Sequence, residues 1–322
     1  MRARRLALAV AALVGLVVSL IGPVAPAEAG ISAFSGHCEI RMKATFTGDG
    51  IDFVTPDPAP CFTDAGTIAR MEIAGSVGPG DTFPGFDCLS GAGRGTFSVT
   101  VADHLRSFSA ENLDMTMVFA AGAATVNLTN WTGNHHFVAS GSFVQPVTVI
   151  GPCLANQMTV TWLGVIDFSA PEVSGQVSAY SGVCQVRLDV ERSGSNVAFT
   201  TGEDPGLCLT DGTALAELDL TGSAGPGETF PGFDCANGAG RGTASMSISD
   251  RWASFSGDNL NVLMVEAGGV VGVDFTTVVA GTTLIASGVF VQPSTVVQTC
   301  VAGATTTSWL GTIVYSNPKV RA

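Results

Sequence analysis

The sequence repeats itself, and no other feature constrains the possible folds as strongly. Cys208 follows Cys61 by 147 residues, and Trp309 follows Trp162 by the same spacing. The repeated segments are ISAFSGHC (31–38) and VSAYSGVC (177–184), GPGDTFPGFDC (78–88) and GPGETFPGFDC (225–235), GAGRGT (91–96) and GAGRGT (238–243), and ASGSFVQP (139–146) and ASGVFVQP (286–293). Two copies are too few for a solenoid, and each copy is long enough to bury a core of its own.

We therefore predict two homologous domains, preceded by a leader that is not part of the fold. The leader begins with the basic MRARR, continues as an apolar run and ends at the A-x-A site Ala27-Glu28-Ala29, a pattern typical of a secretory signal peptide. No stop-transfer segment follows it, and no later segment is long and apolar enough to predict a membrane span in the mature chain. The predicted organisation is a signal peptide at 1–29, a first β domain at 30–168, a linker at 169–176 and a second β domain at 177–318.

The mature chain is strongly acidic. The whole sequence has 14 Lys and Arg against 27 Asp and Glu, and the leader accounts for Arg2, Arg4, Arg5 and Glu28. The mature chain then carries 11 basic and 26 acidic groups, a net charge of −15. Such a surface argues against nucleic acid and against anionic lipid as partners. The Ala and Gly content, with arginine at most basic positions, indicates a high-GC bacterial genome and points to an actinobacterium.

Strand patterns run through each copy. CEIRMKATF (38–46) alternates apolar and polar side chains, as a half-buried strand does, and CQVRLDVE (184–191) repeats the pattern. Further strands of the first copy are expected at 51–55, 67–76, 95–101, 105–119, 124–129, 137–144 and 157–168. We predict an all-β chain of two homologous tandem antiparallel β domains, each with about eight strands in a barrel or sandwich.

Each copy contains four cysteines, and in an exported chain this predicts two disulfides per domain. In an up-and-down meander, the cysteine that starts the first strand and the one that follows the second strand lie at the same end. The other two cysteines of each copy lie at the opposite end. The predicted bonds are therefore Cys38–Cys61 and Cys88–Cys153 in the first copy, and Cys184–Cys208 and Cys235–Cys300 in the second.

The copied GPGDTFPGFDC is the candidate binding site. Phe-Pro-Gly-Phe fits a type II turn with Pro84 and Gly85 at its centre, which would bring two aromatic rings and two acids together. The candidate binding residues are Phe83, Phe86, Asp81 and Asp87, and their equivalents Phe230, Phe233, Glu228 and Asp234. Each residue of the motif also has a structural reason to be copied, and this favours a scaffold over a site.

Catalytic residues, metal ligands and cofactors are not predicted. All four histidines lie in the first copy, and none has a histidine counterpart in the second. The chain has no G-x-S-x-G elbow. The cysteines show no C-x-x-C spacing, which argues against a metal site. GAGRGT lacks the G-K-[ST] ending of a phosphate loop, so a tight turn before the next strand is favoured.

Three functions remain open. The first, which we favour, is a secreted, non-catalytic binding or surface-interaction protein whose extracellular ligand is a polymer, a cell surface or a protein, with duplication giving bivalence. The second is an apolar-ligand carrier, because the domain length and strand count resemble small eight-stranded ligand-holding barrels such as lipocalins and avidins. The third is a secreted enzyme inhibitor or hydrolase, in which the disulfide-tied loop at Cys88 would be presented to a target.

Overall fold

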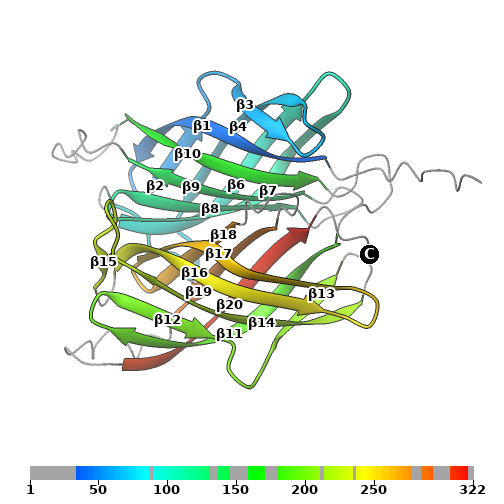
Figure 1. Cartoon of the computed structure of the whole chain (residues 1–322). Helices are drawn as coiled ribbons and strands as arrows, with labels where there is room; N and C mark the ends of the chain where they lie inside the picture. Colours follow the sequence, from blue (N-terminus) through cyan, green and yellow to red (C-terminus); the bar gives the residue numbers. More distant parts are fainter. Residues whose placement is uncertain are drawn as a thin grey trace, which may run out of the picture. The chain divides into compact units, whose positions relative to one another are not determined.

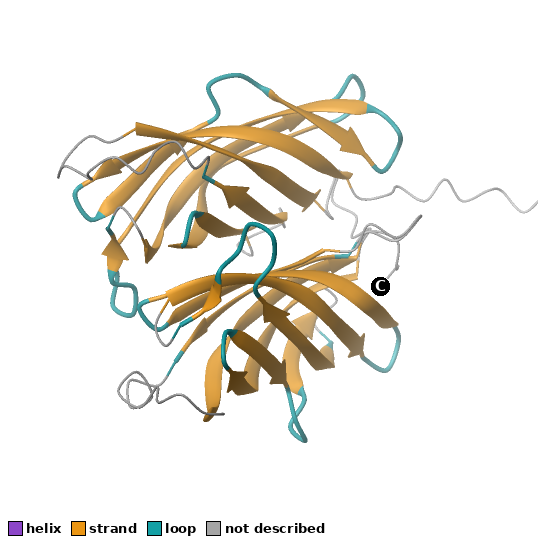
Figure 2. Cartoon of the chain, turned by 60° about the vertical axis from the view of Figure 1, so that its left-hand side comes forward, coloured by secondary structure: helices purple, strands orange, loops and turns teal. Residues whose placement is uncertain are grey.

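The chain is all-β where it is described. The computed structural model describes residues 34–87, 90–130, 137–145, 159–170, 180–210, 214–234, 237–276, 284–292 and 305–317. Every regular element in these ranges is a strand, as Figures 1 and 2 show. The strands fall into two sheets of ten strands each with the same order and the same pairings. The predicted all-β chain with two tandem antiparallel domains is thus confirmed.

The first sheet closes on itself. Its order is β2-β4-β3-β1-β10-β9-β8-β7-β6-β5, with further pairings β2–β1 and β4–β6 that complete the ring. Its strands are β1 (Phe34–Thr47), β2 (Gly50–Val54), β3 (Ala59–Thr63), β4 (Ile68–Gly78), β5 (Gly85–Phe86), β6 (Ser90–Ala102), β7 (Ser107–Ala120), β8 (Ala123–Asn130), β9 (Phe137–Val144) and β10 (Thr159–Ala170).

The second sheet repeats this closure element by element, with β12–β11 and β14–β16 as its additional pairings. Its strands are β11 (Tyr180–Ser193), β12 (Asn196–Thr200), β13 (Gly206–Thr210), β14 (Leu215–Gly225), β15 (Gly232–Phe233), β16 (Asn237–Ser249), β17 (Ser254–Ala267), β18 (Val270–Thr276), β19 (Ile285–Val291) and β20 (Thr305–Asn317). Closure into a barrel removes free strand edges, which are a liability in open sheets.

Ten strands make only eight positions around each barrel. β2 and β3 share one position, because both pair with β1 on one side and with β4 on the other. β5 is a two-residue strand that pairs only with the start of β6. The expected up-and-down meander is present, but the sequence did not reveal β3 and β5. GAGRGT, expected to be a turn, instead forms part of β6 and of its equivalent β16.

The inward side chains that the alternating pattern predicts form a hydrophobic core in each barrel. In the first barrel the Trp162 ring contacts Phe119 at 5.3 Å and Phe46 at 6.5 Å between centroids. Phe137 stacks on Phe108 at 5.0 Å. Aromatic rings of this size dominate the energetics of a core because each buries a large apolar area. The described side chains therefore pack against one another across the interior.

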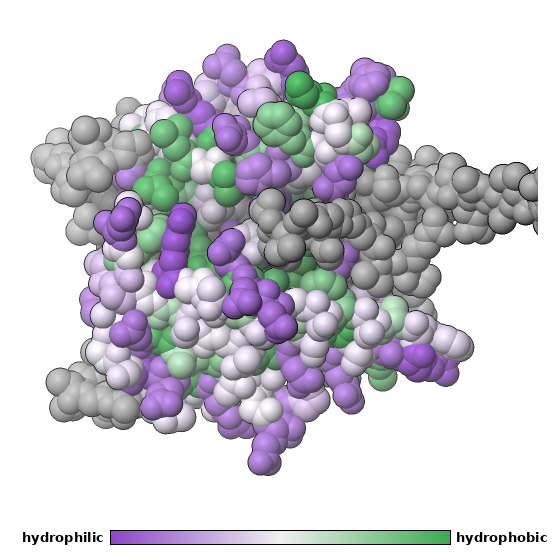
Figure 3. Space-filling model, in the orientation of Figure 1, coloured by the Kyte–Doolittle hydropathy of each residue, from purple (hydrophilic) through white to green (hydrophobic). Residues whose placement is uncertain are grey.

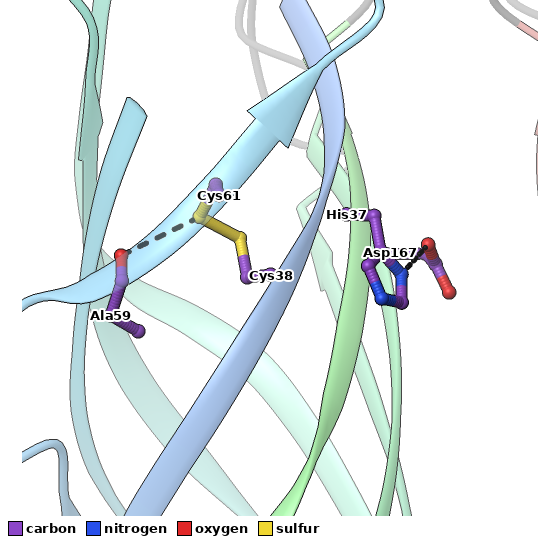
Figure 4. The surroundings of a disulfide bond; sticks show 5 residues. All are labelled: His37, Cys38, Ala59, Cys61 and Asp167. Atoms are coloured by element: carbon purple, nitrogen blue, oxygen red, sulfur yellow. Dashed lines mark hydrogen bonds and ion pairs between the residues drawn. A yellow bond between two sulfur atoms is a disulfide. The ribbon is translucent and has the colours of Figure 1, made fainter. Parts of the chain in front are cut away.

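One disulfide per barrel lies in the described residues. Cys38 on β1 faces Cys61 on β3 in the strand register, and their Cα atoms are 4.0 Å apart (Figure 4). Cys184 and Cys208 are bonded in the same way on β11 and β13. These two predicted pairings are confirmed. The prediction rested on the two cysteines lying at the same end of the barrel, and the structure shows in addition that they face each other on neighbouring strands. The predicted bonds Cys88–Cys153 and Cys235–Cys300 lie outside the described residues.

The repeated segments ENL (111–113) and DNL (258–260) form a β-bulge in each barrel. Asn112 and Asn259 both have φ 57°, a left-handed conformation that asparagine tolerates better than most residues. The register of β6 against β7 shifts beside Asn112, and that of β16 against β17 shifts beside Asn259. A bulge of this kind bends a strand and helps a sheet to curve. The asparagine is therefore copied for its backbone conformation.

Residues 32–322 form one unit, and within it the two barrels contact each other with local two-fold symmetry. Ser316 Oγ donates a hydrogen bond to Ser169 Oγ over 2.9 Å, and these serines occupy equivalent positions of the repeat. A residue that meets its own equivalent lies beside a two-fold axis. Val138 and Ile285, which are also equivalent to each other, pack together beside these serines. A separate apolar cluster draws equivalent residues from both copies: Phe83, Ala92, Val118, Ala120 and Ala123, with Phe230, Ala239, Leu263, Val265, Ala267 and Val270.

The contact explains why some strands lose their alternation. β8 and β9 are buried or half-buried at every position except Val144, since one face points into the barrel and the other meets the second barrel. Small residues allow a close approach, and a Cβ on Gly272 of β18 would overlap the Thr125 hydroxyl of β8. The equivalent strands β18 and β19 show the same continuous burial. A strand buried on both faces reads as a continuous apolar run.

Candidate functional site

The copied Phe-Pro-Gly-Phe turn has the predicted backbone but buried rings. Gly85 and Gly232 have φ of 82° and 84°, as the second central position of a type II turn requires. A Cβ at Gly85 would approach the Asp49 carbonyl oxygen to 2.8 Å, so the turn packs against the β1–β2 hairpin. Phe86 N–H donates to the same carbonyl over 2.9 Å. The motif therefore fastens the loop to the barrel.

The four phenylalanines of the candidate site divide between two apolar environments. Phe86 and Phe233 belong to the cores of their own barrels. Phe83 and Phe230 belong to the apolar cluster between the barrels, where Arg94 and Arg241 lie over their rings at 5.5 and 5.0 Å. None of the four rings exposes more than 6% of its surface, the value at Phe83. The rings are therefore not available to a ligand in this conformation.

The four acids of the candidate site are all exposed. Asp87 accepts a hydrogen bond from the backbone N–H of Ser90, and Asp234 accepts one from Asn237, each over 2.7 Å. These two carboxylates cap the turn that leads into the next strand. Asp81 and Glu228 lie at the outer side of the loop. Of the eight candidate binding residues, only the four acids are therefore exposed, while the four rings are part of the packing.

A polar pair crosses the contact between the barrels. The Ser140 hydroxyl on β9 donates to the carboxylate of Asp274 on β18. The symmetry-equivalent pair consists of Ser287 and Asn127, whose side-chain oxygens are buried without a protein partner. Burial raises the pKa of Asp274 to about 7, with Asp167 adding to the rise while the Ser140 hydrogen bond and Arg241 oppose it. The second copy thus has an ionisable group where the first has an amide.

The first copy has a polar pair of its own on β1 and β10. His37 Nδ1 lies 2.8 Å from Asp167 Oδ1, and Figure 4 shows the pair on the side of β1 opposite the disulfide. The hydrogen bond to Asp167 raises the His37 pKa, against a lowering by burial. Val183 and Val314 face each other at the same register in the second copy. A polar pair replaced by valines in the other copy cannot be part of a function that both copies share.

A charged cluster lies inside the second barrel and has no counterpart in the described residues of the first. Arg192 donates to Glu266 over 2.6 Å and to the Asp234 carbonyl over 2.9 Å, and Gln292 donates to the other oxygen of Glu266 over 2.6 Å. Burial raises the Glu266 pKa, while the charge and hydrogen bonds of Arg192 lower it. The first barrel has phenylalanine at the positions of Arg192 and Glu266. Every polar atom named here is paired, which is how a buried ion pair remains tolerable.

The described residues provide little for catalysis. They contain no group of three or more His, Cys, Asp or Glu side chains placed to hold a metal ion. A crevice between the barrels, lined by residues such as Thr125, Asn127 and Ser287, is too narrow to hold a water molecule. The polar clusters of the two copies differ from each other. A feature that both copies share must therefore be sought on the surface.

Such a feature lies at one end of each barrel, where large apolar side chains are exposed. In the first barrel Phe62 and Ile68 face each other across β3 and β4 and are 61% and 67% exposed. Leu105, in the adjacent β6–β7 turn, is 74% exposed. We call these three residues the first tip. In Figure 3 apolar residues reach the surface at the top of the view, over β3 and β4.

The second barrel exposes apolar residues at the same three positions. Leu209 and Leu215 face each other across β13 and β14, and Trp252 occupies the β16–β17 turn. Their exposed fractions are 55%, 66% and 73%. We call these residues the second tip. Single exposed apolar residues are ordinary on a protein surface, but the same trio exposed in both copies is a repeated surface feature.

Each tip is held by an aspartate that organises its turn. Asp103 accepts hydrogen bonds from the N–H groups of Leu105 and Arg106 over 2.7 and 2.6 Å, and from the Thr67 hydroxyl beside Ile68 over 2.7 Å. Burial acts to raise the Asp103 pKa, but these hydrogen bonds and the Arg106 charge together lower it to about 2. Asp250 accepts from the N–H of Trp252 in the same way. These hydrogen bonds hold the turns that carry Leu105 and Trp252 in a defined conformation.

The apolar residues of the tips are visible in the sequence, but the sequence alone did not identify them as exposed. Phe62, Ile68 and Leu105 are apolar residues on the polar face of a strand or within a turn. Comparison of the two copies identifies them, since Leu209, Leu215 and Trp252 are also apolar. Only the exposed fraction of each side chain separates these residues from core residues. For Phe62 and Ile68 that exposure depends on the pairing of β3 with β4, and the sequence did not predict β3.

Comparison with known protein families and with curated proteins found no match to this chain. The described residues include no helix with the length and apolar character that crossing a membrane requires. The disulfides on β1–β3 and β11–β13 are consistent with an oxidising, extracellular environment.

Proposed function

We propose that this chain is a secreted, non-catalytic binding or surface-interaction protein of a bacterium, built from a duplicated disulfide-stabilised β-barrel. The observation that carries the proposal is the repeated exposure of the two tips. The buried features that the copies share, such as the Phe-Pro-Gly-Phe turn and the Asn112 bulge, are explained by the fold. Leu163 and Leu310 are exposed in both copies as well, but each stands as a single leucine, whereas each tip groups three large apolar side chains.

Duplication fits a binding role because two weak sites on one chain act together. When the first site is occupied, the second binds at a high effective concentration, so the chain is retained far longer than either site alone would allow. The barrels contact each other through apolar and hydrogen-bonded groups, which limits their relative motion. A fixed pair of sites loses less conformational entropy on binding than a flexibly linked pair.

The other two functions have less support. A carrier requires interior space, and aromatic rings such as Trp162 and Phe119 contact one another across the first barrel. An inhibitor that uses the Cys88 loop requires exposed side chains, and Phe83 and Phe86 are buried. A hydrolase requires a catalytic set, and the described polar clusters differ between the copies.

The proposal is tested by retention of the full-length mature protein on a panel of extracellular surfaces. The panel contains intact actinobacterial cells, insoluble polysaccharides and lipid vesicles. We expect retention on at least one surface, and we expect Leu105→Ser and Trp252→Ser each to weaken it by far more than half. Together the two changes should abolish it. The exposed pair Leu163 and Leu310, changed to serine, provides a control of the same chemistry away from the tips.

If the wild-type protein is retained on none of the surfaces in the panel, the proposed binding role is contradicted. Equal retention of the single-tip variants and the wild type would contradict bivalence. Because all four control and test residues are exposed, the variants are expected to unfold at the wild-type temperature, and this is checked for each by circular dichroism.

A further inference from the structure

The tips carry information about the chemistry of their partner, and this inference rests on the proposed function. A stable protein–protein interface buries roughly 800 Å² on each partner and about 20–30 residues a side. Each tip consists of three large side chains at a hairpin and a neighbouring turn. A surface of that size is small for specific recognition of a folded protein. It is sufficient for insertion into a fluid apolar layer, where the layer adapts to the side chains.

The residue types at the tips suit the boundary between lipid headgroups and acyl chains. Trp252 combines an apolar ring with a polar N–H, a composition that is enriched at membrane interfaces. The Arg251 guanidinium lies 4.4 Å from the centre of the Trp252 ring. In the first tip, Arg106 beside Leu105 lies over the Phe34 ring and pairs with Asp103, so the basic group placed to meet a headgroup is Arg251 of the second tip. A basic group beside an apolar side chain can reach the phosphate of a headgroup while the apolar group enters the acyl layer.

The charge of the chain restricts the kind of lipid. The mature protein carries a net charge of −15, so an anionic membrane repels it as a whole. A zwitterionic or uncharged headgroup avoids this repulsion and still offers a phosphate or hydroxyl to arginine. We propose that the two tips insert into a lipid surface of low net charge, with Phe62, Ile68 and Leu105 of one barrel and Leu209, Leu215 and Trp252 of the other entering the apolar layer.

Trp252 provides a reporter for the experiment. Among the tryptophans of the described residues, Trp162 and Trp309 are fully buried, whereas Trp252 is 73% exposed. Trp131 lies outside the described residues, so a Trp252 variant is needed to assign the change in emission. Addition of phosphatidylcholine vesicles to the full-length protein is expected to shift the Trp252 emission to shorter wavelength and to protect it from acrylamide. Trp252→Leu, which introduces the residue that the first tip has at this position, is expected to keep vesicle co-sedimentation within about two-fold while losing the shift.

Three double variants and a change of lipid composition complete the test. Leu105→Ser with Ile68→Ser, and Leu209→Ser with Leu215→Ser, are each expected to reduce the partition coefficient by about ten-fold or more, since each change removes an apolar side chain from the lipid. Leu163→Ser with Leu310→Ser is expected to change it less than two-fold. Replacing a third of the phosphatidylcholine with phosphatidylglycerol is expected to weaken binding of the wild type, and added salt is expected to reduce that difference.

Three results would overturn the lipid inference. They are binding to anionic vesicles alone, an equal effect of the tip and control variants, and absence of vesicle binding while the protein is retained on cells or polysaccharide. The last result would leave the proposed binding role in place and reassign its partner. Absence of retention on vesicles, cells and polysaccharide together would contradict both.

Discussion

Asp274 is expected to make the stability of the folded chain depend on pH, because burial at the contact between the barrels raises the pKa of its carboxyl. Its carboxyl is fully buried beside Ser140 and its pKa is raised to about 7, from an ordinary value of 3.8. Below pH 3.8 the group is protonated in both the folded and the unfolded chain. Between these two values the folded chain holds a proton that the unfolded chain releases. Stability therefore falls as the pH rises towards 7 and stays low above it.

The difference of about three pKa units corresponds to about 4 kcal/mol, because one unit is worth about 1.4 kcal/mol. Asp274→Asn removes the ionisable group, and the symmetry-equivalent Asn127 shows that an amide fits the site. The variant is expected to be more stable than the wild type at pH 8 by up to that amount and about equal to it at pH 4. His37 and Glu266, whose pKa values are also raised, add trends of the same sign that persist in the variant.

Urea unfolding of the oxidised protein at pH 4, 6 and 8, followed by fluorescence and circular dichroism, measures the effect. Asn127→Asp is the converse change. It places a carboxyl opposite Ser287 and is expected to lower stability at pH 8 more than at pH 4. If Asp274→Asn leaves the pH dependence unchanged, or destabilises the protein at pH 8, the argument from burial is wrong.

Three further substitutions test other parts of the structure by urea unfolding. Gly272→Ala is expected to cost about 1–3 kcal/mol, because the new methyl group overlaps the Thr125 hydroxyl; Thr125→Ala should recover part of the loss, and absence of recovery would place the strain elsewhere. Glu266→Gln leaves Arg192 charged and buried, and is expected to cost about 3–5 kcal/mol. Changing both residues to phenylalanine, as in the first barrel, should recover most of it. Phe83→Ala is expected to cost about 3–5 kcal/mol, whereas an unchanged stability would indicate that the ring is not part of the interface.

The fold was largely predictable because its two main signals are local. The alternation of apolar and polar residues, with the turns between strands, predicted an up-and-down meander. The meander in turn predicted the Cys38–Cys61 and Cys184–Cys208 bonds. β3 was missed because APCFT (59–63) is short, begins after two prolines and alternates over too few residues to be recognised. GAGRGT was assigned to a turn because glycine is typical of turns, but a Cβ at Gly93 would overlap the Phe86 ring. These glycines make room for a neighbouring ring within a strand.

The candidate site was less predictable, for a physical reason. A sequence shows that Phe83 and Phe230 are copied, but not whether a copied ring faces solvent or a second barrel. The local two-fold contact decides this, and it depends on pairs such as Ser169 and Ser316 that carry no recognisable motif. Exposed apolar residues are equally hard to find, since an apolar residue in a strand is ordinarily assigned to the core.

The central claim is that the chain acts through its tips and not through its copied aromatic turn. The most direct measurement compares retention on one surface, either phosphatidylcholine vesicles or whichever panel member retains the wild type, for two variants of the full-length protein. One variant carries Leu105→Ser and Trp252→Ser, and the other carries Asp81→Asn and Glu228→Gln, the exposed acids of the turn. We expect the first variant to lose retention and the second to keep it. Loss of retention in the second variant alone would contradict a role for the tips and would place the binding site at the exposed acids of the Phe-Pro-Gly-Phe turn.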